Sequence, residues 1–270
     1  MQDSPIRLGA MLFTLVDPAR GHEVAYNRWY ERDHFYGGVM VGPGTLAGGR
    51  WVATRALKEL RFPAGVDPDD AVADPLDAGS YLATYFIEAS HIAEHFAWAN
   101  AEVFKLYEAG RGFDDWIHAH TALYTFQRAH SRDTDGVPAE LALDHRFAGL
   151  VTLHVDRTDG VRHGELDEWL AGPGRDHFLG VDSPLAMVTT WRPIVPKGDQ
   201  AKSPMKLGSG PGSPSRSMLV AFSDAEPAAG WDRVRAAATA IDESGLATVR
   251  LAAPFVPTIV GTDTYTDQLW

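Results

Sequence analysis

The chain of 270 residues is long enough for one large domain or two modest ones, and its 45% hydrophobic and 22% charged residues are ordinary for a globular protein. It contains no cysteine, which excludes disulfides, thiolate metal sites, cysteine nucleophiles and iron–sulfur clusters. A formal net charge of −12 disfavours nucleic acid, and no run approaches the roughly 18–20 apolar residues that a membrane span needs. We therefore expect a cytoplasmic protein whose partner is a small hydrophobic molecule, with no nucleic acid and no membrane.

The first half of the chain alternates between strand-like and helix-like segments. Nearly continuous or alternating apolar runs predict strands, whereas capped segments with apolar residues every three or four positions predict helices. We expect Gly37-Gly38 to end the first helix. In chain order the predictions are a strand at 6–16, a helix at 22–35, strands at 49–57 and 80–88, a helix at 91–109 and a strand at 121–128.

The second half repeats the first. Trp169 follows Trp29, and Trp191 follows Trp51, by the same interval of 140 residues (169 − 29 and 191 − 51). The tetrapeptide Arg-Asp-His-Phe occurs at 32–35 and again at 175–178, an interval of 143 (175 − 32). A match in register with two tryptophans indicates an internal duplication with three residues added before the second histidine. The inserted Gly172-Pro173-Gly174 segment should break the second copy of the helix.

The duplication divides the chain into two halves of the same predicted element order, β-α-β-β-α-β, which is the ferredoxin-like order. We place the first half at 1–135 and the second at 136–270, with a flexible Gly-, Ser- and Pro-rich linker at 196–215. Later strands are predicted at 147–155, 217–223 and 249–260, and a helix at 227–245. The first half should carry the active site and the second half, around His177, should be a degenerate copy.

The segment Trp29-Tyr30-Glu31-Arg32-Asp33-His34 resembles the WYDxEH signature of the dimeric α/β-barrel superfamily, in particular its EthD-like and polyketide-cyclase-like branches. The Pro-Gly-Thr-Leu turn at 43–46 is similar to that family's entry to its second strand. The resemblance implies an α+β fold in which two tandem ferredoxin-like halves join their antiparallel sheets into one α/β barrel. The family contains cyclases, lyases, cofactor-free monooxygenases and haem enzymes, so the fold alone does not select a reaction.

His34 and Tyr30 are the predicted catalytic residues. Tyr26, Tyr30 and His34 recur every four positions and should share one helix face. A histidine in a half-apolar pocket can move a proton near neutral pH, and a tyrosine can donate a hydrogen bond to a carbonyl or enolate oxygen. We expect Asp33 to pair with Arg32, or with Arg50 or Arg55 on the next strand.

Five further residues are predicted to bind substrate: Tyr26, Trp29, Trp51, Tyr85 and His95. His91 and His95 have the i, i+4 spacing of metal ligands, but no third ligand is identifiable, and we predict no metal site. His118 and His120 would share one side of an extended segment and would diverge in a helix, and we assign them no role.

The leading hypothesis is a cofactor-independent enzyme. It would carry out proton-transfer chemistry (cyclisation, dehydration, isomerisation or lyase cleavage) on a small hydrophobic, aromatic or polyketide-like carbonyl compound. One alternative is a haem- or metal-dependent oxidoreductase or monooxygenase that uses His91 or His95. Another is a non-catalytic binding or scaffolding protein with a filled interior. Because the fusion supplies both barrel halves, the chain can be a monomer or a homodimer.

Overall fold

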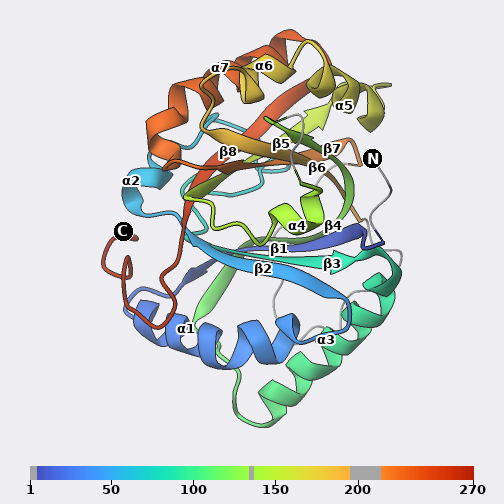
Figure 1. Cartoon of the computed structure of the whole chain (residues 1–270). Coiled ribbons are helices and arrows are strands. Elements are labelled where there is room, and N and C mark those ends of the chain that lie inside the picture. The colour runs from blue at the N-terminus through green and yellow to red at the C-terminus, as the bar shows by residue number, and fades with distance from the viewer. Residues whose placement is uncertain (1–4, 134–136, 195–213) are drawn as a thin grey trace.

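The computed structural model of the chain describes residues 5–133, 137–194 and 214–270, which form a closed barrel of antiparallel strands with helices outside it (Figure 1). The order around the barrel is β1-β3-β2-β8-β5-β7-β6-β4. The strands are β1 (Leu8–Pro18), β2 (Thr45–Val52), β3 (Tyr81–Glu88), β4 (Trp116–Ser131), β5 (Gly149–Arg157), β6 (Leu185–Pro193), β7 (Arg216–Ser223) and β8 (Ala247–Pro257).

The helices cover the barrel from two opposite sides, below and above it in Figure 1. The first half contributes α1 (Glu23–Trp29), η1 (Tyr30–Met40), α2 (Arg55–Lys58), η2 (Ala89–His91) and α3 (Ile92–Glu108). The second half follows α4 (Ala139–Ala142) and contributes α5 (His163–Ala171), α6 (Arg175–Leu179), η3 (Pro227–Gly230) and α7 (Trp231–Glu243). The predicted fold, two tandem β-α-β-β-α-β halves whose sheets close one barrel, is confirmed.

Two seams of unequal length join the halves. At one seam β4 pairs with β6 from Tyr124 to Ser131, whereas at the other β2 pairs with β8 only through Trp51–Pro257 and Val52–Val256. The tail after β8 reinforces the shorter seam, because the backbone N–H of Thr258 donates to the carbonyl of Arg50. The backbone therefore closes the barrel without an exposed edge along most of its circumference.

The apolar core lies in three layers, because each strand has one face toward the barrel lumen and one toward the helices. The lumen and the helix-covered face of the first half form one continuous cluster that includes Phe13, Tyr85 and Trp191. The helix-covered face of the second half forms a separate cluster around Leu166 and Trp231. The halves are thus joined through the lumen, while each keeps its own helix–sheet layer.

Several element boundaries differ from the sequence predictions. The second strand ends at Val52 instead of continuing to 57, because Arg55–Lys58 forms a short helix. The fourth strand runs from Trp116 to Ser131, beyond the predicted 121–128 on both sides. The break predicted at Gly172-Pro173-Gly174 is confirmed, since α5 ends before it and α6 starts after it. The predicted linker at 196–215 lies, apart from residues 214 and 215, outside the described residues, as do the positions around the predicted boundary at 135.

Candidate functional site

The helices of the first half pack on a sheet face whose side chains form a regular grid. Two rows of this face cross β3, β1 and β4, namely Tyr85, Leu12 and Leu123, and then Tyr81, Val16 and His118. Helix α1 and its continuation η1 lie over the β3 side, where Tyr26 contacts Tyr81 and Tyr30 contacts Tyr85. The structure therefore brings together Tyr26, Trp29, Tyr30, His34 and Tyr85 in one helix–sheet layer, as the site prediction requires.

A π-helical stretch determines how His34 is held. The helix does not end at Gly37-Gly38 as predicted but continues to Met40 with wider turns, and the N–H of Val41 bonds to the carbonyl of Tyr36, five residues earlier. In an α-helix, residues five apart point in different directions, whereas i→i+5 bonding brings them into line. Trp29 and His34 are five apart, and their rings stack with centroids 4.9 Å apart.

Packing explains why the glycines do not end this helix. A side chain at Gly38 would come within 3.4 Å of both His34 Nδ1 and a methyl group of Val103 on α3. The missing side chain lets α3 approach the π-helical stretch closely, and this tertiary contact outweighs the low helix propensity of glycine. Glycine here thus serves helix–helix packing, which the local sequence signal does not reveal.

His34 is a buried, neutral imidazole. It is 5% exposed, and its ring lies between Trp29 and Tyr30, with Trp116 at 6.0 Å. Burial, together with the neighbouring His118 and Arg50, lowers the pKa of His34 to about 3. Its Nδ1 atom is buried without a hydrogen-bond partner. The side chain is thus uncharged at neutral pH and offers a ring nitrogen that no protein group occupies.

The ring of Tyr30 packs against this imidazole with centroids 4.9 Å apart, and its hydroxyl contacts that of Tyr85. The hydroxyls of Tyr30 and Tyr85 are 2.9 Å apart, and burial raises the pKa of Tyr30 to about 12 and that of Tyr85 well above its usual value. Both groups are therefore protonated at neutral pH. Only one of them can donate in their mutual hydrogen bond, so the proton of the other remains able to bind a ligand oxygen.

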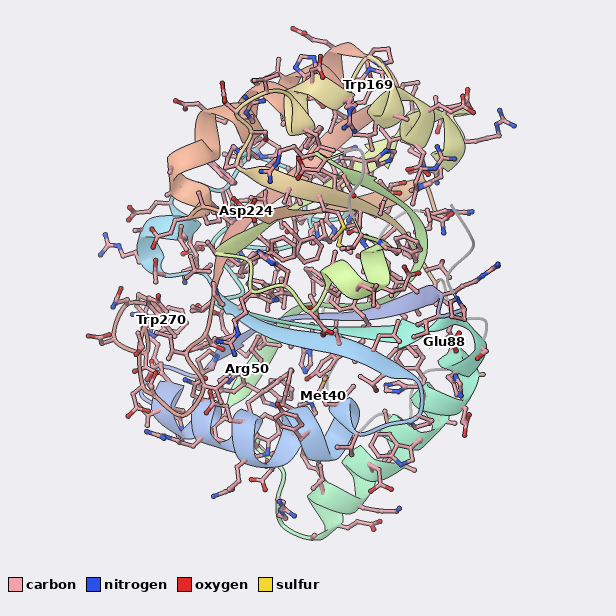
Figure 2. All side chains as sticks on the ribbon, viewed as in Figure 1. Met40, Arg50, Glu88, Trp169, Asp224 and Trp270 are labelled. Atoms are coloured by element: carbon pink, nitrogen blue, oxygen red, sulfur yellow. The ribbon has the colours of Figure 1, made fainter. Side chains whose placement is uncertain are left out.

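Arg50 gives this layer a buried positive charge. Its guanidinium lies 4.5 Å from the centre of the Tyr30 ring and bonds to Asn27 Oδ1 at 2.7 Å and Glu31 Oε1 at 3.2 Å, between β2 and α1 (Figure 2). Of the partners predicted for Asp33, Arg32 is confirmed, whereas Arg50 and Arg55 do not contact it. The second partner of Asp33 is Arg111, where the chain leaves α3.

The ion pairs of Asp33 with Arg32 and Arg111 help to position His34 indirectly. Burial alone would raise the pKa of Asp33, but the hydrogen bonds from Arg32 and Arg111 hold this pKa below its usual value. The carbonyl of Arg111 accepts a hydrogen bond from Trp29 Nε1 at 2.8 Å, and Trp29 stacks on His34. The loop after α3 therefore fixes the indole against which the imidazole rests.

Trp51 lies on the other side of the sheet. Its Nε1 donates to Thr84 Oγ1 at 3.3 Å, and Thr84 alternates along β3 with Tyr85, which faces the helices. Trp51 therefore faces the barrel lumen and does not join Tyr30 and His34. Sequence alternation separates the two faces of a strand but does not say which face the helices cover.

His118 is a member of the site that sequence reasoning missed. If extended, His118 and His120 were expected to share one side, but β4 has an extra residue between them: Val16 pairs with His118 and the adjacent Leu15 with His120. This bulge turns His118 toward the helices and His120 into the lumen. Burial lowers the pKa of His118 to about 4, Thr121 occupies its Nδ1 at 2.6 Å, and its Nε2 has no partner.

Beside the two histidines, the helix-facing side is only partly covered. The apolar side chains of Leu12 on β1, Leu123 on β4, and Ile92 and Phe96 on α3 are half-buried and pack against the core cluster or its neighbouring sheet residues. We call these four residues the open apolar face. It adjoins the buried row through Leu12, which pairs with Tyr85.

His95 has one free ring nitrogen, and the chain packs closely around one edge of its ring. Its Nδ1–H donates to the carbonyl of Pro43 at 3.0 Å, which leaves Nε2 as the free acceptor nitrogen, buried and without a partner. A methyl group at Gly42 would lie 2.8 Å from the imidazole Cε1 and 2.6 Å from the Trp98 ring. The backbone at Gly42 therefore packs closely against the Cε1 edge of the imidazole and against the Trp98 ring.

The other histidine of that helix has a different environment. His91 is partly exposed and bonds to Glu88 at 2.7 Å, whereas His95 bonds to Pro43, so the i, i+4 pair does not converge on one ion. Among the described residues, no group of three or more His, Asp or Glu side chains is placed to hold a metal. Nor does any helix in the described ranges have the length and apolar character to span a bilayer.

The second half does not reproduce the histidine site. His177, the repeat partner of His34, is exposed, and its ring stacks 6.3 Å from Trp169. A polar cluster occupies the helix–sheet layer instead, with Asp167 at its centre. Its members, all at least nine-tenths buried, are His130, His163, Asp167, Thr190 and Ser217.

Asp167 holds this cluster together. Its carboxylate accepts from Thr190 Oγ1 at 2.6 Å and lies 3.3 Å from His163 Nε2 and 3.7 Å from His130 Nε2. Burial opposes ionisation, but these contacts hold the pKa of Asp167 well below its usual range. Asp167 and Thr190 are the repeat partners of Asn27 and Arg50, so both halves bond the first helix to the strand at the same two positions. Sequence reasoning missed this cluster, for which the i, i+4 spacing of His163 and Asp167 is the available signal.

Thr190→Val should lower the free energy of unfolding by about 1–3 kcal/mol, because it leaves a buried carboxylate oxygen without its donor. Thr125→Val is the matched control, since that hydroxyl bonds to the carbonyl of Arg192 at an exposed position of a strand. Urea unfolding of both variants measures the difference. Equal stabilities would show that the Thr190 hydroxyl contributes nothing to the cluster.

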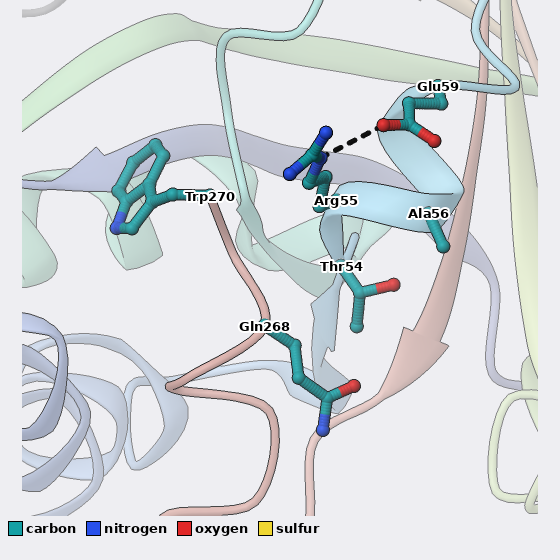
Figure 3. A pocket seen from close by; sticks show the side chains of 6 residues that line it. All are labelled: Thr54, Arg55, Ala56, Glu59, Gln268 and Trp270. Atoms are coloured by element: carbon teal, nitrogen blue, oxygen red, sulfur yellow. Dashed lines mark hydrogen bonds and ion pairs between the residues drawn. The ribbon is translucent and has the colours of Figure 1, made fainter.

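A groove at the surface lies away from His34 and His118. It has a volume of about 380 Å³ and runs between α2 and the chain end, where it is lined by Thr54, Arg55, Ala56, Glu59, Gln268 and Trp270 (Figure 3). The Arg55–Glu59 pair on its rim is exposed, and Trp270 rests against Arg20 and Lys58. Its charged groups already have partners within the protein.

Comparisons with known proteins identify the fold of the chain. The sequence matches no protein-family model and no curated protein sequence. Among solved structures, the chain is similar to a candidate chlorite dismutase, with a TM-score of 0.53, 8% identity, and coverage of 98% of this chain and 100% of the other. The chain therefore has the α/β-barrel fold of tandem ferredoxin-like halves that this structure also has.

Weaker likenesses extend to other structures. An anthrone oxidase-like protein aligns with a TM-score of 0.47 and 12% identity over 96% of this chain and 98% of its own. A variant of a Rhodococcus jostii dye-decolourising peroxidase in complex with haem aligns with a TM-score of 0.46 and 9% identity over 93% of each chain. The EthD-like resemblance of the segment at 29–34 stays a prediction.

Proposed function

We propose that the chain is a cofactor-independent enzyme that transfers a proton on a small hydrophobic carbonyl compound at the helix-facing side of its first half. The observation that carries the proposal is His34, a buried neutral imidazole with an unpartnered nitrogen beside two protonated tyrosine hydroxyls. The open apolar face next to this row supplies the surface that an aromatic or polyketide-like substrate would contact.

The chemistry follows from these protonation states. His34 would accept the proton on the carbon next to the carbonyl, and the electron pair of the broken C–H bond would move into an enolate. The hydroxyl of Tyr30 or Tyr85 that is not donating to the other would bond to the enolate oxygen. A pKa near 3 makes His34 a weak base in the free protein. During the reaction, however, its imidazolium would form together with the enolate anion, and this opposite charge would favour the protonated form. The stacked Trp29 ring would stabilise that cation further.

The test is deuterium exchange at the carbon next to the carbonyl, followed by NMR in D₂O with a panel of small aryl ketones and 1,3-diketones. We expect exchange with the wild-type protein and a 10²–10⁴-fold slower rate for His34→Gln, the range typical of general acid–base catalysis. His177→Gln is the control, because it changes the exposed repeat partner. Binding of a ketone without faster exchange would favour the non-catalytic alternative.

A haem-dependent oxidoreductase is the second candidate. The likeness to a candidate chlorite dismutase bears more directly on this reading than on proton transfer, and His95 has the fixed tautomer of an axial ligand. Against it stands the close packing of Gly42 and Trp98 around that ring. A Soret band in the purified protein that disappears in His95→Ala would replace the first proposal with this one.

A further inference from the structure

A segment after the last strand ties the first helix to the barrel. Beyond β8, residues 258–270 run back past α1 and end beside α2 (Figure 1). Most of these side chains are exposed, but Leu269 is fully buried and belongs to the core cluster of the first half. We call residues 258–270 the strap, and Leu269 is its apolar anchor.

Contacts on both sides of Leu269 fix the end of the strap. The backbone N–H of Arg55, on α2, donates to the carbonyl of Gln268 at 2.7 Å. The indole Nε1 of Trp270 donates to Glu23 Oε1, at the start of α1, also at 2.7 Å. The strap therefore joins α1 to α2, the helices that precede and follow β2 in the chain.

The middle of the strap binds three side chains of the first helix and its π-helical continuation. The N–H of Gly261 donates to Glu31 Oε2 at 2.9 Å, and Asn27 Nδ2 donates to the carbonyl of Thr262 at 3.4 Å. Arg28 also reaches this part of the strap, through the carbonyl of Gly261 at 3.4 Å. The strap thus follows one side of α1 over more than a helical turn.

Two of these side chains bind Arg50 with their other polar atom. Arg50 Nη2 donates to Asn27 Oδ1 at 2.7 Å, and its Nη1 donates to Glu31 Oε1 at 3.2 Å. The backbone of the same arginine accepts the first hydrogen bond of the strap, from the N–H of Thr258 at 3.0 Å. Asn27 and Glu31 therefore form a double bridge between the strap and the guanidinium of Arg50.

Arg50 extends this chain of contacts to the tyrosines. Its guanidinium lies 4.5 Å from the centre of the Tyr30 ring and 5.5 Å from that of Tyr81. Burial raises the pKa of Tyr30 to about 12, while the hydrogen bond with Tyr85 and the charge of Arg50 oppose this rise. A displacement of Arg50 would therefore change both the packing and the electrostatics of Tyr30.

We propose that the strap holds Arg50 and Tyr30 in position and that Leu269 keeps the strap docked. Asn27 and Glu31 are the positioning residues, because an unbroken series of direct contacts through them connects the strap to the site. The consequence for catalysis rests on the proposed function. The coupling between the strap and Tyr30 does not, because it is a property of the fold.

The experiment compares Leu269→Asp with Leu141→Asp, which adds the same charge at an exposed position of α4. A carboxylate at the buried position would undock the strap, because enclosing an unpaired charge is costly. Hydrogen–deuterium exchange with mass spectrometry should then show a loss of amide protection across the strap. Leu141→Asp should keep the protection of the wild-type protein.

Fluorine NMR of protein labelled with fluorotyrosine reports on the site itself. The chain has eight tyrosines, and Tyr30→Phe assigns the resonance of Tyr30. We expect this resonance to move in Leu269→Asp, while that of the exposed Tyr36, on the same π-helical stretch, stays in place. Neither resonance should move in Leu141→Asp.

Two further variants test the bridge between the strap and the guanidinium. Glu31→Gln leaves one acceptor oxygen where the carboxylate has two and removes the charge beside Arg50, so it should also move the Tyr30 resonance. Arg28→Met removes strap contacts that do not lead to Arg50, and it should leave the resonance in place.

If the proposed reaction takes place, Leu269→Asp should also slow the deuterium exchange of the ketone by about 10–10²-fold, an effect that a small misplacement of site residues can produce. A wild-type protein that exchanges no ketone would contradict the proposed function, and the NMR comparison would still test the coupling.

Two results would overturn the proposal. One is a strap that loses amide protection while the Tyr30 resonance stays unchanged. The other is a strap that stays protected in both Leu269→Asp and Leu269→Ala, since Leu269 would then not keep it docked. Circular dichroism checks that the variants fold, and Leu269→Ala replaces Leu269→Asp in both measurements if the charged variant does not fold.

Discussion

Asp156→Leu should lower the free energy of unfolding by about 3–5 kcal/mol, which is typical of leaving one partner of a buried ion pair without the other. Arg216 is 1% exposed and would keep its charge inside the barrel, while Arg250 would lose the same carboxylate. Urea unfolding at neutral pH measures the change. The large effect is expected because the buried guanidinium of Arg216 loses its carboxylate partner, whereas Arg250 keeps its pair with Asp70.

Two matched variants sharpen this test. Asp263→Asn removes a carboxylate whose pair with Arg28 is about half exposed on both sides, and it should cost no more than about 1 kcal/mol. Combining Asp156→Leu with Arg216→Met should recover much of the lost stability, because the stranded charge is then removed as well. If Asp156→Leu lowers the free energy of unfolding as little as Asp263→Asn does, the surroundings of Asp156 and Arg216 are more hydrated than their burial implies.

Acid should destabilise the protein well before its carboxylates are protonated. Burial lowers the pKa of His34 and His120 to about 3 and that of His118 to about 4, whereas the unfolded chain titrates near 6.5. Between these values the unfolded state binds protons that the native state does not, so stability is present above pH 6.5 and is lost as the pH falls toward 3–4. Each histidine contributes about 1.4 kcal/mol per pH unit within the window.

The contribution of one histidine can be isolated by substitution. His120→Phe should flatten the dependence of unfolding free energy on pH between 6 and 4 by about 1.4 kcal/mol per unit. Its ring lies between Phe13 and His154, so phenylalanine preserves the packing, although the bond to Tyr124 is lost. An unchanged slope in His120→Phe would mean that this ring is protonated in the native state.

The fold was predictable because its signal is distributed over the whole chain. Repeated spacings such as Trp29–Trp169 and Trp51–Trp191 gave the duplication, and alternating strand and helix patterns gave the ferredoxin-like order. The grouping of Tyr26, Tyr30 and His34 could also be predicted, since residues four apart lie on the same side of both an α-helix and a π-helix. These features depend on local periodicity, which a sequence displays directly.

The features that were missed depend on single residues or distant contacts. One extra residue in β4 separates His118 from His120, and no composition signal marks it. Asp33 pairs with the predicted Arg32, but its second partner, Arg111, lies 78 positions later and was not among the candidates. Trp51 and Arg50 occupy opposite faces of β2, and only the tertiary structure shows which face meets the helices. The stacking of Trp29 on His34 required a π-helical register that local propensity does not favour.

Fusion of the two halves has a consequence for how this protein can change. In a homodimer built from identical halves, every substitution appears twice, so a change that suits one layer is imposed on the other. In the fused chain, Asn27 and Arg50 face tyrosines in one layer, while their counterparts Asp167 and Thr190 organise histidines in the other. Covalent linkage has removed the symmetry constraint, so one layer can be selected for its chemistry while the other is selected for stability alone.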